Sequence, residues 1–187
     1  MDLSCRSKSF AQWLLRDAGL GLAACLLACG PVQLVSVLPT TGTAAAPNTN
    51  SRDRLQVEVD ASTVPLPLRA VGSGTRFIDL ERALKVSIQR IVSANGLPTK
   101  DQTLHYLLYV ELVEARAEVS SGRLLVQLTT RVTLRQESGY TYIAQTHVHA
   151  TATGSMDPDD GRPVVLECVS TLAAQLRGWI SSMPLAP

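Results

Sequence analysis

The sequence predicts an α+β domain, a two-layer sandwich in which two helices cover one face of an antiparallel sheet. Residues 104–153 alternate apolar and polar side chains over long stretches, with the period of two that a half-buried strand requires. Residues 77–95 and 165–180 instead repeat apolar side chains every three or four positions, as an amphipathic helix does. The expected order of elements is therefore strand, helix, three-stranded meander and helix.

The first strand is predicted at residues 55–60, where Leu-Gln-Val-Glu-Val-Asp alternates. Pro65 and Pro67 interrupt regular structure after it, and Gly72-Ser73-Gly74 is typical of a loop. We therefore expect an irregular connection between this strand and the first helix.

The first helix is predicted from Phe77 to Asn95. Acidic residues occupy its first turns, where the helix dipole stabilises anions. Asn95-Gly96 favours a helix end, because both residues tolerate the left-handed backbone conformation. The apolar stripe consists of Phe77, Leu80, Leu84, Ile88 and Ile91.

The meander is predicted to begin with a long strand at residues 104–119. Its apolar face changes phase at Val113, which indicates either a β-bulge or a break between two strands. The second strand, residues 123–136, alternates most regularly, and Glu137-Ser138-Gly139 is typical of a hairpin loop. The third strand is predicted at residues 140–153.

The pairing of the second and third strands can be predicted from their apolar faces. Placing Gln136 opposite Tyr140 sets Val132 opposite Ala144, so that apolar side chains meet. The inner face of the third strand would then contain Tyr142, Ala144, Thr146, Val148, Ala150 and Ala152.

The last helix is predicted to follow an acidic loop, with Pro163 in its first turn and Pro184 beyond its end. Asp160 or a neighbour could cap it. Cys168 falls on its apolar stripe, so we interpret this cysteine as a small buried side chain.

The N-terminal segment has the pattern of an export signal. A weakly basic start precedes the apolar run Ala18–Ala28, which is shorter than the roughly 20 residues that span a bilayer. Leu26-Leu27-Ala28-Cys29 resembles the bacterial lipoprotein signal, and Leu22-Ala23-Ala24-Cys25 is a second possible frame. An ordinary secretory cleavage site is the alternative.

The lipoprotein resemblance implies cleavage before Cys29, with Cys25 as the runner-up, and covalent attachment of diacylglycerol and an N-acyl chain such as palmitate. Several acyl chains anchor a protein stably. Gly30 after the cysteine implies, by the same resemblance, the outer membrane rather than retention in the inner one. No cofactor is expected beyond these chains.

Three regions are therefore predicted: a signal peptide at 1–28, a lipidated N-terminus and flexible tether at 29–54, and a globular domain at 55–183. About 15 flexible residues have a root-mean-square span of roughly 20 Å, enough to hold a domain off the membrane. The apolar patch Val32–Leu38 inside this tether could also be an edge strand, or pack on the membrane or on a partner.

Composition and motifs exclude several classes of function. The net charge of +1 argues against a protein built to bind nucleic acid. No nucleophile motif or phosphate-binding loop is present, so we expect no enzymatic activity. Asp157, Asp159 and Asp160 lack the downstream glutamate of a calcium loop.

Candidate contact residues lie on the polar face of the predicted sheet. His147 and His149 share one face of a strand at a spacing that can bind metal, but their predicted neighbours Thr129 and Gln127 are poor ligands. We expect no metal site. With the histidines, Arg123, Arg131 and Arg135 would form a basic stripe for lipid phosphates or an acidic partner, or simply a solvated face.

A lipoprotein signal followed by strand, helix, three strands and helix resembles two groups of envelope lipoproteins. One is the auxiliary lipoprotein of lipid-transporting ABC systems, of the paraquat-inducible type, and Tyr106–Leu112 followed by a glycine hairpin is similar to it. The other is the lipopolysaccharide-assembly lipoprotein. The resemblance implies a non-enzymatic accessory subunit of an envelope transport or assembly complex, and a lipid-binding periplasmic module is the alternative.

Overall fold

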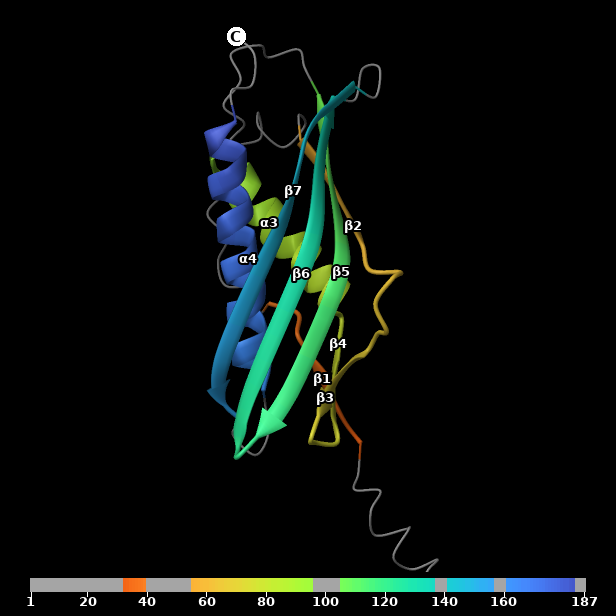
Figure 1. Cartoon of the computed structure of the whole chain (residues 1–187), viewed down its shortest axis with the longest axis vertical. Helices are drawn as coiled ribbons and strands as arrows, with labels where there is room; N and C mark the ends of the chain where they lie inside the picture. Colours follow the sequence, from red (N-terminus) through yellow and green to blue (C-terminus); the bar gives the residue numbers. More distant parts are fainter. Residues whose placement is uncertain (1–31, 40–54, 96–104, 137–140, 157–160, 184–187) are drawn as a thin grey trace, which may run out of the picture. The chain divides into compact units, whose positions relative to one another are not determined.

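The structure is a computed structural model that describes residues 32–39, 55–95, 105–136, 141–156 and 161–183. The unit from Leu34 to Pro187 contains the sheet and the two described helices. Figure 1 shows both helices on one face of the sheet, which confirms the predicted α+β two-layer architecture.

The antiparallel meander is formed by β5 (Tyr106–Ser120), β6 (Arg123–Gln136) and β7 (Thr141–Ser155). β5 is one continuous strand, and its pairing with β6 shifts between Leu112 and Glu114. The bulge interpretation of the phase change at Val113 is therefore confirmed, and the extra residue leaves this side chain 40% exposed.

The predicted register of β6 and β7 is wrong by two residues over most of their length. Val132 pairs with Thr146 rather than Ala144, because Gln136 pairs with Thr141 instead of Tyr140 and an irregularity in β7 between Tyr142 and Ala144 adds a second residue to the shift. The shift of two keeps the inner face inward, with Val148, Ala150 and Ala152 buried. Tyr142, beyond the irregularity, is turned outward and is 57% exposed, whereas the inner face was predicted for it.

The sheet is mixed, whereas a purely antiparallel sheet was predicted. β2 (Leu55–Asp60) and β3 (Leu68–Val71) both pair with β5 in parallel, β2 along its first half and β3 near its end. β2 and β5 are parallel because the connection between them contains the helix α3, which lets the chain return and run in the same direction.

The segment predicted as an irregular connection contains a hairpin. β3 pairs antiparallel with β4 (Thr75–Ile78) around the glycine turn at residues 72–74. Strands of four residues are too short for their alternation of apolar and polar side chains to be recognised in the sequence, so the glycines alone guided the prediction, and they indicated a loop. Phe77 belongs to β4 rather than to the helix, although it is fully buried as predicted.

The first part of the predicted tether belongs to the sheet. β1 (Gln33–Ser36) pairs with β4, which gives the strand order β1-β4-β3-β5-β6-β7 with β2 beside β5. Val35 and Val37 are buried, and the Val37 amide donates to the Ile78 carbonyl at 3.2 Å. The edge-strand alternative for the Val32–Leu38 patch is therefore the observed one.

The two helices close the core. α3 (Leu80–Asn95) begins after Asp79, whose positive φ of 65° separates it from β4, and α4 (Arg162–Ser182) has the predicted proline in its first turn. The N-cap of α4 is Gly161, so no side chain caps it. The predicted stripes are buried, including Leu84, Ile88, Cys168, Leu172 and Leu176.

Candidate functional site

The predicted contact residues all lie on the outer face of the sheet, opposite the helices. Arg123, Arg131 and Arg135 alternate along β6, and His147 and His149 alternate along β7. All five side chains are exposed, while the even-numbered residues of β6 from Leu124 to Leu134 are buried against the helices. Alternation along the strand therefore assigned these residues to the correct face.

The two histidines have different neighbours. The corrected register places His149 opposite Thr129 and His147 opposite Arg131. The His149 ring lies 3.1 Å from the hydroxyl oxygens of Thr129 and Thr151, one at each ring nitrogen. Within the described residues, no group of three or more His, Cys, Asp or Glu side chains could hold a metal ion.

The arginine stripe of β6 is flanked by acidic residues on β5. Arg131 donates to Glu111 at 3.1 Å, and on β5 itself Arg116 pairs with Glu114 at 2.6 Å. These pairs are exposed and contribute little to stability. They do offset charge, so this face is mixed rather than uniformly basic, which reduces its attraction for phosphates.

A hydrogen-bonded carboxylate lies at the β2 side of the same face. The Tyr109 hydroxyl donates to Asp60 at 2.7 Å, and the Ser62 amide donates to the same carboxylate at 2.8 Å. The hydrogen bond from the Ser62 amide is the largest cause that lowers the pKa of Asp60, and the hydrogen bond from Tyr109 is the next. The same hydrogen bond to Asp60 raises the pKa of Tyr109. This pairing joins β2 to β5 and gathers no nucleophile with a base.

β7 is the edge of the sheet at the end of the strand order opposite β1. It pairs with β6 along its length and ends the strand order, and no other strand in the described part of the chain pairs with it. Its 15 residues contain no Asp, Glu, Lys or Arg. Exposed edges usually carry such charges, which oppose pairing with another strand. The uncharged run from 141 to 155 was the sequence signal for this edge, but only the topology identifies which strand is last.

The β3–β4 hairpin brings together two arginines that sequence reasoning did not select. Arg69 and Arg76 are directly opposite each other and exposed. Like charges at a directly opposed pair are unfavourable. The two ion pairs found among the described residues involve neither of these arginines. Because their segment was expected to be a loop, nothing in the sequence placed them side by side.

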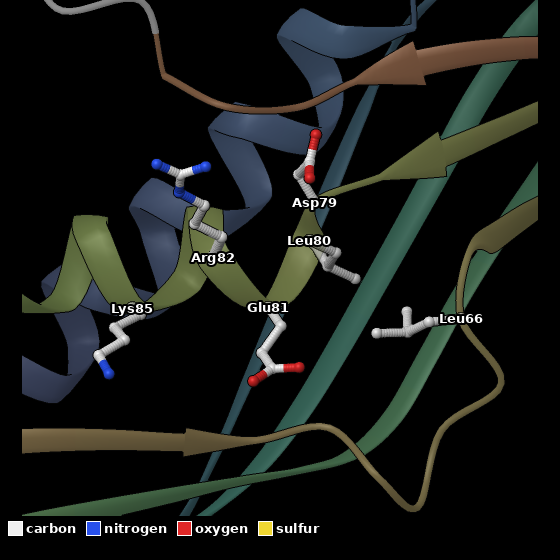
Figure 2. Close-up of a pocket in the computed structure, with 6 residues that line it drawn as sticks. All are labelled: Leu66, Asp79, Leu80, Glu81, Arg82 and Lys85. Atoms are coloured by element: carbon white, nitrogen blue, oxygen red, sulfur yellow. The ribbon is translucent and has the colours of Figure 1, made fainter.

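Two shallow hollows open at the rim of the molecule. One, of about 470 Å³, surrounds the first turns of α3 and is lined by Leu66, Asp79, Leu80, Glu81, Arg82 and Lys85. Figure 2 shows its charged side chains pointing in different directions rather than converging. The second, of about 410 Å³, lies near the β5–β6 turn and includes Arg123 and Glu118. Neither hollow gathers the groups of a catalytic site.

Cys168 lies in the core between α4 and the sheet. Its side chain is fully buried, and its thiol donates to the Ala150 carbonyl at 3.4 Å. Burial raises the pKa of this thiol to about 11, so it remains protonated and unreactive at neutral pH. The prediction of a small buried side chain is confirmed.

Cys29 and Cys25, the predicted lipidation residues, lie outside the described residues, as do the acidic loop at 157–160 and the hairpin loop at 137–140. No helix in the described part of the chain is long and apolar enough to cross a membrane.

Comparison with solved structures supports the fold. A Xanthomonas campestris protein of the domain family DUF330 superposes with a TM-score of 0.52 at 12% identity, over 80% of this chain and 94% of that chain. A minor lipoprotein from Acinetobacter baumannii reaches a TM-score of 0.43 at 20% identity, over 70% and 92%. The PelC dodecamer of Paraburkholderia phytofirmans reaches 0.41 at 18%, over 74% and 94%. At 12% identity the likeness to the Xanthomonas campestris protein shows the fold alone. No family model and no curated protein matches the chain.

Proposed function

We propose that this protein is a non-enzymatic accessory lipoprotein of an envelope transport or assembly complex. Cys29 would carry the acyl chains, and Gly30 would direct the protein to the outer membrane, on the periplasmic side. The compact domain would then dock on a protein partner through the β7 edge.

The β7 edge carries the proposal. A strand of 15 residues presents a long row of backbone donors and acceptors on the side away from β6. A partner strand can pair with such a row and gain its affinity from backbone hydrogen bonds. The absence of Asp, Glu, Lys and Arg from Thr141 to Ser155 leaves that pairing unopposed by charge.

The packing of the core favours this proposal over a lipid-binding module. Acyl chains would need room between the helices and the sheet, but side chains fill the described part of that interface. Leu128 and Leu134 of β6, and Leu172 and Leu176 of α4, are all fully buried. The two hollows lie at the rim instead. The pairing of Arg131 with Glu111 also weakens the case for a basic lipid-binding face.

The anchor is tested by Cys29→Ala in the full chain. We expect loss of acyl labelling and of membrane association, with Cys25→Ala as the matched control that retains both. Labelling that persists in Cys29→Ala and disappears in Cys25→Ala would transfer the anchor to the other frame.

The docking edge is tested by co-purification of the lipidated chain after gentle extraction of membranes. Gln145→Lys and Thr153→Lys each add a charge at an exposed position of β7. Gln127→Lys adds the same charge on the same face of β6, one strand away from the edge. We expect the two β7 variants to lose the partner and the β6 variant to keep it. Equal recovery of a partner in all three would refute docking through β7, and recovery of none by the unaltered chain would refute the accessory role.

A further inference from the structure

The position of β1 limits how far the domain can stand from the membrane. This inference rests on the proposed anchor at Cys29. Leu34 is held in the sheet, since the next core residues, Val35 and Val37, are buried and Arg162 donates to the Leu38 carbonyl. The five peptide units from Cys29 to Leu34 reach at most about 18 Å, whatever conformation they take. The sheet therefore begins close to the lipid, and the predicted long tether does not separate them.

The end of the sheet nearest this attachment carries a basic pair. Figure 1 shows β1, β4 and β3 together at the end of the sheet where β5 turns into β6. Arg69 of β3 and Arg76 of β4 are opposite each other on its outer face. Two guanidinium groups at one position repel each other unless an anion lies between them. A phosphate group accepts hydrogen bonds from both, with the geometry that arginine favours.

Exposed apolar side chains accompany the two arginines. Val71 follows Arg69 by two residues on the same face of β3 and is 63% exposed. Leu34 of β1 is 62% exposed and also points away from the core. Two acidic residues adjoin this surface in the described part of the chain: Glu118 of β5 is opposite Val71, and Asp79, directly after β4, accepts a hydrogen bond from Ser36 of β1. Basic and apolar side chains together are typical of surfaces that contact anionic membranes.

We infer that the outer face of β1, β4 and β3 rests on the bilayer to which the protein is anchored. Arg69 and Arg76 bind the phosphates of anionic lipid headgroups, and Leu34 and Val71 enter the interface beside them. The anchor raises the local concentration of the surface, so weak contacts suffice. A domain whose outer face contacts the bilayer in this way has a fixed orientation instead of rotating on a flexible tether.

The test uses the lipidated full chain reconstituted into vesicles. Val71→Cys provides a labelling site, since Cys168 is fully buried and the remaining cysteines are removed or acylated if the anchor is as proposed. An environment-sensitive fluorophore is attached there, and a quencher is placed on the lipid headgroups. Thr141→Cys is the matched control, because Thr141 begins β7 at the other end of the sheet.

We expect strong quenching at position 71 and weak quenching at position 141 in vesicles that contain phosphatidylglycerol. Replacing that lipid with phosphatidylcholine should reduce quenching at position 71. Arg69→Glu and Arg76→Glu should each lower the ratio of molecules whose β1, β4 and β3 face contacts the bilayer to those in which it does not, at least about fivefold. Arg135→Glu, at the far end of the outer face, should leave that ratio unchanged.

Two results would overturn the inference, and they are distinguishable. A chain that is inserted in the vesicles but quenched equally at positions 71 and 141 refutes the contact of this face with the bilayer and leaves the anchor in place. A chain that carries no acyl chains on Cys29 refutes the anchor, and with it the contact with the bilayer.

Discussion

Cys168 allows the packing of α4 on the sheet to be tested quantitatively. Its thiol is fully buried against β6 and β7, and burial raises its pKa from an ordinary 9.0 to about 11. Well below pH 9.0 the thiol is protonated in both states, so its contribution to stability is complete. Above that pH the unfolded chain loses the proton first, which stabilises the unfolded state. Stability therefore falls as pH rises, until the folded thiol ionises as well.

The size of the effect follows from the two pKa values. At about pH 11 the unfolded thiol is almost fully ionised and the folded thiol about half so. The free energy of unfolding should then be lower by roughly 2 kcal/mol than at about pH 8, through this group alone.

Urea denaturation of the unaltered chain and of Cys168→Ala, at several pH values, measures this change in the free energy of unfolding. Other groups that titrate in this range, including Tyr109, are common to both chains and cancel in the difference. Cys168→Ala should be less stable than the unaltered chain at about pH 8, because it leaves a cavity. That deficit should shrink by roughly 2 kcal/mol toward about pH 11. A deficit that stays constant across this range would refute the argument that the buried thiol resists ionisation.

Three glycine substitutions test other parts of the fold. Gly72→Ala should destabilise the protein by more than about 1 kcal/mol, because φ is +89° and a Cβ would collide with the Val119 carbonyl oxygen; Gly122→Ala, with φ +74° and open space around it, is the control that should cost less in thermal denaturation. Gly178→Ala in α4 should raise stability by about 0.5–1 kcal/mol, because a Cβ there meets nothing and alanine favours the helix; a lower melting temperature would contradict this.

Several features of the fold could be predicted because they depend on local periodicity. The alternation along residues 123–136 assigned Arg131 to the outer face and Leu128 to the core, and the structure confirms both. The phase change at Val113 indicated either a bulge or a break, and the structure contains the bulge. The stripe containing Cys168 likewise assigned this residue to the core. Each of these features follows from how side chains alternate or repeat within a single element.

Pairing between elements was predicted less well. The pairing of Gln136 with Thr141 displaced the β7 register by one residue and the irregularity beside Ala144 by another, and a total displacement of two leaves the apolar pattern almost unchanged. The candidate sites show the same division. His147 and His149 were placed on the correct face, but their partners were misassigned, with Arg131 and Thr129 as the observed neighbours.

The sequence by itself therefore determined the two helices, the long strands and their buried faces, because each depends on a continuous run of residues. Only the tertiary structure decided that β2 and β3 join β5 in parallel, that β7 is an open edge, and that Arg69 lies opposite Arg76. Backbone hydrogen bonds between strands are made by groups that every residue except proline carries in full. The choice of partner strand is thus set by how the whole chain packs, and both proposed contact surfaces depend on that choice.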